Sequence, residues 1–233
     1  RRMGLNAIRL LPDTEDYVDA PACPTCEPTA NATAVAHLGD IALAAEEMGL
    51  YLDITGNGIS YHHHSGSWFD GLDDSPGAEA LRWRAQEVFW EAVAAELQPR
   101  TSVAWYDLIN EPALNAPSTE WCFPADLPAE TPCWNPNIVK TLTDPADPSR
   151  QRTRLEIARA WTERMRDAIK VGAGDTVHPV SVGQLSFCGG ALNQASRELA
   201  DFDMVHMYPE DATLAADINT VNNCKQAGRT LVV

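Results

Sequence analysis

Short apolar runs alternate with helical patterns along the chain, and this alternation constrains the fold more than any other feature. Runs suited to buried strands cover residues 7–11, 50–54, 102–110, 179–182, 204–207 and 230–233. Apolar residues recur at three- and four-residue steps over 34–48, 79–97 and 154–171, with weaker helical patterns over 191–199 and 212–227. Strands that alternate with helices predict βα units around a parallel sheet.

The number of strands favours a barrel. A closed eight-stranded barrel needs about 250 residues or more, and this chain has 233. We therefore expect one domain over residues 1–233, an incomplete TIM (β/α)8 barrel in which about strands 2 to 7 are present. A doubly wound sheet is the alternative, but no Gly-x-Gly-x-x-Gly follows the first run, which counts against a dinucleotide-binding version.

Two strands carry polar residues that need an explanation. The third run ends in Asn110-Glu111-Pro112, and Pro112 stops the strand because it has no N–H to donate. Chemistry in parallel sheets is done at this end of the strands, although Glu111 could instead cap the next segment.

Arg9 lies inside the first run, where an unpaired charge is costly. We expect it to have an acidic partner, in a site or in a structural salt bridge at the rim.

The charge balance limits the partners. There are 33 acidic and 17 basic residues, for a net charge of -16, which disfavours nucleic acid and anionic membrane surfaces as partners. A neutral ligand fits better. No run of about 18 apolar residues suggests a membrane span, and no signal-peptide pattern is visible at the start of the sequence.

The cysteines favour disulfides over a metal site. Four of the six lie in loop-like, proline-rich sequence: Cys23, Cys26, Cys122 and Cys133. Two local disulfides are plausible, because no second Cys-x-x-Cys or His pair completes a zinc site with Cys23 and Cys26. Cys188 and Cys224 are either buried thiols or a third pair. Together with the glycosylation pattern Asn31-Ala32-Thr33, the cysteines indicate a secreted protein.

Three short motifs carry a family resemblance. Asn110-Glu111-Pro112 after one strand, His206-Met207-Tyr208 after a later one, and Arg9 at the end of Gly4–Arg9 resemble glycoside hydrolase family 5, the cellulase family. The match spans nearly the whole chain. Each motif is short, but their order and their placement at strand ends make the combination fairly specific. Other families of the same barrel clan share the Asn-Glu pair.

The resemblance implies hydrolysis of β-1,4-type glycosidic bonds, cellulase- or mannanase-like, by a retaining mechanism. Glu111 would be the general acid and then the general base, which needs a carboxyl of raised pKa. Asn110 would bind the sugar hydroxyl next to the reacting carbon. Arg9, His206 and Tyr208 would surround the nucleophile and hold it ionised. A satisfied core histidine is the alternative for His206.

The nucleophile of the family is a glutamate at the end of the seventh strand. Thr230–Val233 resembles that strand, so we expect the glutamate just after Val233 and predict that this chain is an inactive fragment of the enzyme. One position departs from the family pattern. The family's third strand often closes with a histidine two residues after the position of Asp53, and here that residue is Thr55.

Long loops should shape the substrate site, over residues 55–76 and the proline-rich segment 113–148. In the first loop we expect four residues to contact sugar: Asn57, His62, His64 and Trp68. A metal on His62-His63-His64 is disfavoured because neighbouring side chains point different ways, and a plain solvated loop is the other alternative. Trp105, Trp121 and Trp134 are further sugar-binding candidates, although Trp105 also suits the core.

The expected protein is thus a secreted, monomeric β-glycan hydrolase that needs no cofactor or metal. Two alternatives stay open: a barrel that only binds glycan, and an unrelated metal-dependent βα-barrel hydrolase in which Glu111 acts with the metal. A glutamate soon after Val233 would favour the retaining enzyme over the binding barrel, and stoichiometric zinc would favour the metal-dependent hydrolase.

Overall fold

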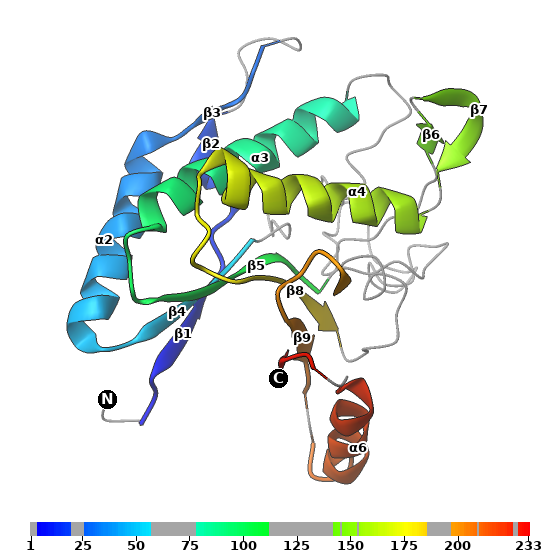
Figure 1. The fold of residues 1–233 in the computed structure, drawn as a ribbon. Coiled ribbons are helices and arrows are strands. Elements are labelled where there is room, and N and C mark those ends of the chain that lie inside the picture. The colour runs from blue at the N-terminus through cyan, green and yellow to red at the C-terminus, as the bar shows by residue number, and fades with distance from the viewer. Residues whose placement is uncertain are drawn as a thin grey trace, which may run out of the picture.

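A six-stranded parallel sheet organises the computed structural model, which describes residues 4–19, 26–56, 78–111, 142–144, 146–152, 154–185, 197–208, 210–225 and 228–233. The strands follow one another in chain order: β1 (Ala7–Leu10), β4 (Tyr51–Thr55), β5 (Val103–Asn110), β8 (Val180–Leu185), β9 (Asp203–His206) and β10 (Leu231–Val232). Sequential parallel neighbours are the strand order of a barrel. The sheet curls as part of one, which confirms the predicted incomplete α/β barrel (Figure 1).

Three long helices connect the first strands and cover one face of the sheet: α2 (Ala32–Met48), α3 (Ala78–Leu97) and α4 (Arg154–Asp167) (Figure 1). Asn31 caps α2, since its side chain accepts from the backbone N–H of Ala34 at 3.2 Å. Gly49 ends α2 at φ 64°, a left-handed conformation that glycine adopts without a Cβ penalty. The predicted helix over 154–171 differs at its end, because Ala168–Gly172 form a π-helical turn, η2.

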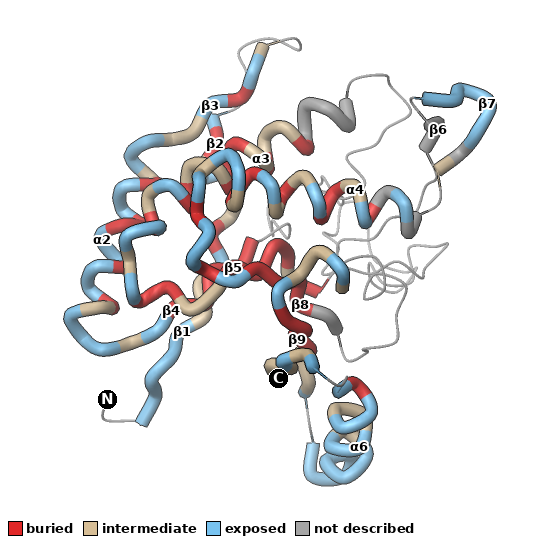
Figure 2. The backbone as a smooth tube through the Cα atoms, viewed as in Figure 1, coloured by how far each residue is buried: buried red, intermediate tan, exposed pale blue. Residues whose placement is uncertain are grey.

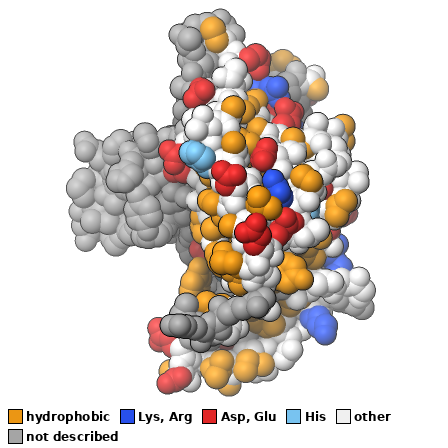
Figure 3. Space-filling model, turned by 90° about the vertical axis from the view of Figure 1, so that its left-hand side faces the viewer, with side chains coloured by type: hydrophobic (Ala, Val, Ile, Leu, Met, Phe, Trp, Pro, Cys, Tyr) orange, Lys and Arg blue, Asp and Glu red, His pale blue; other side chains and the backbone are white. Residues whose placement is uncertain are grey.

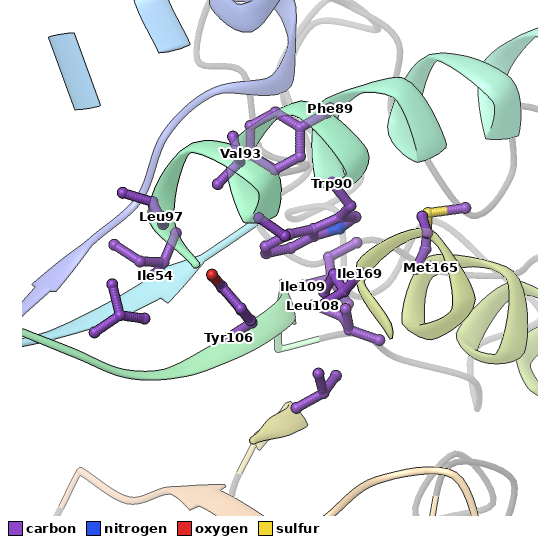
Figure 4. Packing of buried hydrophobic residues seen from close by; sticks show 14 of the residues in the cluster. Ile54, Phe89, Trp90, Val93, Leu97, Tyr106, Leu108, Ile109, Met165 and Ile169 are labelled. Carbon is purple, nitrogen blue, oxygen red and sulfur yellow. The ribbon is translucent and has the colours of Figure 1, made fainter. Parts of the chain in front are cut away.

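The core lies between these helices and the sheet. Aromatic and aliphatic side chains of α3 pack onto β4 and β5 (Figure 4). Phe89 and Trp90 meet edge to face at 4.9 Å between ring centroids, and Trp90 meets Tyr106 of β5 at 5.8 Å. Burial is concentrated along β5, β8 and β9 and on the helix sides that face them, whereas α6 (Leu214–Cys224) is mostly exposed (Figure 2). The core therefore fixes β5, the strand that precedes Glu111.

Two small antiparallel ladders lie where no strand was predicted from the sequence. After the one-turn helix α1 (Thr14–Tyr17), β2 (Val18–Asp19) pairs with β3 (Thr29–Ala30), between the first strand and the first long helix. At the end of the proline-rich segment, β6 (Leu142–Asp144) pairs with β7 (Asp147–Arg152). Proline is compatible with a strand whose N–H side is unpaired, so Pro148 does not prevent this second hairpin.

The described residues bear on two other expectations. Cys26 and Cys224 are both disulfide-bonded, which settles for Cys224 the choice between a thiol and a disulfide. The other four cysteines lie outside the described residues. No helix in the described part of the chain has the length and apolar character needed to cross a membrane. On the face shown in Figure 3, acidic side chains are interspersed with hydrophobic ones and basic side chains are sparse.

Candidate active site

Glu111 occupies a sharp turn at the carboxyl end of β5. Its φ is 48°, the one positive value among the described non-glycine residues. Its backbone N–H donates to the carbonyl of Gly183 at 3.0 Å, and the N–H of Asn110 donates to Gly56 at 3.2 Å. The pairing of β5 with β8 shifts register between Asp107 and Asn110. Such a conformation costs about 1 kcal/mol or more and persists only where its surroundings hold it, so the strand ends keep Glu111 in place.

Two side chains from the end of β9 bind the Glu111 carboxylate. Oε1 accepts from His206 Nδ1 at 3.0 Å and from the Tyr208 hydroxyl. Burial raises the pKa of Glu111, but the hydrogen bonds from His206 and Tyr208, with the charges of His206 and Arg9, outweigh burial and lower it. Burial and the bond to Glu111 raise the pKa of Tyr208 to about 12.

The lowered pKa corrects the raised value expected of a general acid. Two donors on one oxygen favour the ionised carboxylate. Their effect on the pKa exceeds that of burial, although the residue is only 8% exposed. His206 and Tyr208 were expected beside the nucleophile. In the described residues their hydrogen-bond partner is Glu111 itself.

Arg9 has the acidic partner expected from sequence, and it has two. Nη2 donates to Asp107 Oδ2 at 2.8 Å and Nε lies 3.3 Å from Asp53 Oδ2. The same guanidinium donates to Asn110 Oδ1 at 3.0 Å and to Thr55 Oγ1 at 2.8 Å. Strand register explains this convergence, since Arg9 lies opposite Asp53 and Thr55 lies opposite Asp107 in the parallel ladders.

The two aspartates compete for one cation. Burial raises the pKa of Asp107, which is 0% exposed, against the opposing influence of Arg9, His206 and the Gly183 N–H. Burial and the charge of Asp107 raise the pKa of Asp53 to about 7, despite Arg9 and Thr55. Both carboxyls therefore release their protons at a higher pH than a free aspartate does.

The fold thus brings together all five predicted catalytic residues, Arg9, Asn110, Glu111, His206 and Tyr208, at the carboxyl ends of β1, β5 and β9. Their roles in catalysis stay predictions. The four predicted substrate contacts, Asn57, His62, His64 and Trp68, lie outside the described residues, as do Trp121 and Trp134. Trp105 meets Phe202 edge to face at 5.6 Å, in keeping with its alternative placement as a packing residue.

Asp107 and its neighbour Asp53 were not singled out as site residues from sequence. A signal for Asp107 was present, because it is a charge in the middle of an apolar strand and such a charge must be paired. Arg9 is a charge of opposite sign in the first strand, and it likewise needs a partner. To pair Arg9 with Asp107 would have required knowledge of the register between strands that are far apart in sequence.

Among the described residues, no three His, Cys, Asp or Glu side chains are grouped as a metal site. The carboxylates of Asp53 and Asp107 converge on the guanidinium of Arg9 instead. What this arrangement offers chemically is a buried, hydrogen-bonded carboxylate at a strand end, beside an amide and a phenol.

Comparisons by sequence identify no relative: no family model matches the chain, and no curated protein does. Comparison of structures identifies glycoside hydrolases. A GH5-4 broad specificity endoglucanase from Clostridium acetobutylicum aligns with 99% of this chain at a TM-score of 0.63 and 11% identity. GH5_18 from Streptomyces cattleya, solved in complex with GlcNAc, aligns with 89% at 0.55 and 16%. Endo-glycoceramidase II from Rhodococcus sp., in a cellobiose-like imidazole complex, aligns with 95% at 0.50 and 16%.

These likenesses establish the fold. The chain has the barrel architecture of family 5 glycoside hydrolases, as the motifs implied. It spans 66%, 43% and 53% of the three solved chains, respectively.

Proposed function

We propose that the chain belongs to glycoside hydrolase family 5 and forms part of the catalytic barrel of a secreted, monomeric enzyme that hydrolyses β-1,4-type glycosidic bonds with retention. One observation carries the proposal: a buried glutamate at the end of β5 is held by His206 and Tyr208, beside an asparagine held by Arg9. The family 5 fold of the chain supports it. The disulfide-bonded Cys26 and Cys224 support export, because disulfides persist in oxidising compartments.

Asn110 is oriented for a sugar hydroxyl. Its Oδ1 accepts from Arg9 at 3.0 Å, which turns the amide Nδ2 to the other side as a donor. A donor to the hydroxyl next to the reacting carbon stabilises the transition state.

Glu111 is the general acid and base in this proposal. As an acid it must carry a proton, and its pKa is lowered by His206 and Tyr208. A second carboxylate at the retaining distance of about 5 to 5.5 Å would raise that pKa by like-charge repulsion. The acid therefore depends on the nucleophile as its electrostatic partner.

Strand register supports a nucleophile just after Val233. Leu231 lies opposite Asp203 and Val232 opposite Met204. If the ladder continues in this register, the residue after Val233 lies level with His206, whose ring contacts Glu111. A glutamate there would face the acid/base, and the 233-residue chain without it would not hydrolyse glycans.

The test is an assay of a chain that includes the residues proposed to follow Val233. Glu111→Gln should lower turnover of neutral β-glucan or mannan by about 100-fold or more. It should slow glycosyl transfer from dinitrophenyl glycosides far less, because that leaving group needs no proton. Glu198→Gln, a surface glutamate paired with Arg159, is the matched control and should retain full turnover. NMR of the first-formed sugar should show the retained anomer.

Equal turnover by Glu111→Gln would contradict the assigned role. Glycan binding without hydrolysis by the extended protein would identify a binding barrel instead, and hydrolysis by the 233-residue chain alone would contradict the nucleophile's position.

A further inference from the structure

Asp107 is a fully buried carboxylate that the proposed mechanism does not use. Its Oδ2 accepts from Arg9 at 2.8 Å, and its Oδ1 accepts from the backbone N–H of Gly183 at 2.6 Å. Oδ2 also lies 3.9 Å from His206 Nε2. Asp107 thus faces the far side of the imidazole that binds Glu111.

The ring of His206 lies between two carboxylates. Nδ1 is 3.0 Å from Glu111 Oε1, and an ionised carboxylate only accepts, so Nδ1 must carry a proton for this bond to form. Nε2 faces Asp107 at 3.9 Å, beyond a direct hydrogen bond but within ion-pair distance when the ring is charged. The other charged or titratable groups of the described site are Arg9 on β1, Asp53 on β4 and Tyr208 after β9.

Gly183 makes this arrangement possible. A Cβ at this position would lie 2.6 Å from Cε1 and Nε2 of His206 and 2.7 Å from Asp107 Oδ2, closer than packed atoms tolerate. The carbonyl of Gly183 also accepts from the N–H of Glu111 at 3.0 Å. One residue of β8 therefore hydrogen-bonds to Asp107 and Glu111 and leaves the space beside it to the His206 ring.

We propose that Asp107 and Gly183 are positioning residues: together they hold the His206 ring against Glu111 and, through that ring, set how readily Glu111 takes up and releases its proton. The inference deepens the proposed function, since it concerns the same carboxylate. It assigns a function to a fully buried carboxylate and a buried glycine.

Neutralising Asp107 distinguishes positioning from a direct charge effect, because the two shift the pKa of Glu111 in opposite directions. A nearby negative charge raises the pKa of a carboxyl, so neutralising Asp107 should by charge alone lower the pKa of Glu111. If Asp107 instead holds His206 in place, its loss weakens a hydrogen bond that lowers the pKa of Glu111, and that pKa rises.

The experiment is a ¹³C NMR titration of the Glu111 carboxyl in the 233-residue chain, with the resonance assigned from Glu111→Gln. Asp107→Asn should shift the Glu111 midpoint to higher pH. Gly183→Ala keeps the Asp107 charge but displaces the ring, and it should shift the midpoint the same way. Asp53→Asn is the matched control, because it removes the other Arg9 partner, 3.3 Å away, and should not raise the midpoint. An unchanged or lowered midpoint in both Asp107→Asn and Gly183→Ala would overturn the proposal.

A measurement on the unmodified chain tests the premise of the proposal even if Asp107→Asn and Gly183→Ala fail to fold. The ¹⁵N shifts of His206, assigned from His206→Gln, should show a proton on Nδ1 while Glu111 is ionised. A ring protonated on Nε2 alone would refute the positioning role. Neither readout requires hydrolysis. If the extended protein fails to cleave glycans but Asp107→Asn shifts Glu111 as expected, the proposed function falls and the positioning role stands.

Discussion

At the scale of single residues, one guanidinium holds the site together. Arg9 contacts Asp53, Asp107, Thr55 and Asn110. Two carboxylates against one cation leave a surplus of negative charge in a buried place, where ionisation is costly. Burial raises the pKa of both carboxyls, and together with the charge of Asp107 it raises that of Asp53 to about 7.

The raised pKa of Asp53 predicts a pH-dependent stability. The folded state binds this proton more tightly than the unfolded state, so its contribution is fully present below the unfolded pKa of about 3.9 and is lost as pH rises through about 7. Asp53→Asn removes the ionisation. Relative to the unmodified chain, the variant should gain unfolding free energy between pH 4 and pH 7, on the order of a few kcal/mol.

Urea unfolding at several pH values measures this difference. Asp40→Asn on the exposed surface of α2 is the control and should give a nearly flat difference. A difference that stays constant across the interval for Asp53→Asn would show that Asp53 does not titrate there.

At the scale of elements, β5 separates two buried networks at its opposite faces. Asp107 points to Arg9, whereas the hydroxyl of its neighbour Tyr106 donates to Asp175 Oδ2 at 2.9 Å. The same Oδ2 lies 2.7 Å from His178 Nδ1, and Asp175 Oδ1 accepts from the N–H groups of Val177 and His178. This second network ties β5 to the turn that leads into β8, so it fixes the spacing of the two strands that carry Asp107 and Gly183.

Tyr106→Phe tests this connection between β5 and the turn before β8. Burial raises the pKa of Asp175, but the bonds from His178 and Tyr106 outweigh burial and lower it. The stabilisation is therefore present above the unfolded pKa of an aspartate and is lost as pH falls through the lower folded value. We expect Tyr106→Phe to lower the free energy of unfolding by about 1.5 to 3 kcal/mol at neutral pH, and by less in acid.

Chemical denaturation at pH 7 and at pH 3 measures the effect of Tyr106→Phe. Tyr51 is 54% exposed, so the control variant Tyr51→Phe should change stability little at either pH. Equal losses for the two variants would rule out a special bond between Tyr106 and Asp175.

At the scale of the whole molecule, net charge should select among glycans. With a formal charge of -16, the protein repels anionic chains over distances set by salt. Under the proposed function, the affinity for a neutral β-glucan should exceed that for its carboxymethylated form at about 0.01 M salt. The gap should narrow at about 0.15 M, where the Debye length falls from about 30 Å to about 8 Å.

Affinity electrophoresis on gels that contain either polymer measures both binding strengths. Tighter binding to the carboxymethylated polymer at low salt would show that a local basic surface, and not the net charge, governs recognition.

Local sequence was sufficient for the strands and for the end of β5. Apolar runs located all six strands of the described sheet, and Pro112 marked where β5 must stop. Burial on both faces explains the runs of the inner strands, whereas the edge strands β1 and β10 are only partly buried. The small β2–β3 and β6–β7 ladders escaped prediction, since two-stranded pairs depend on contacts and have no long apolar pattern.

The sequence by itself determined that Glu111 lies at a strand end in a βα protein and that Arg9 needs an acidic partner. Only the tertiary structure decided which acids those are, because Asp53 and Asp107 meet Arg9 through the register of three strands distant in sequence. It also decided the protonation of the site. Burial and hydrogen bonds from other strands set the pKa of each carboxyl, and they lower that of Glu111 while raising that of Asp53.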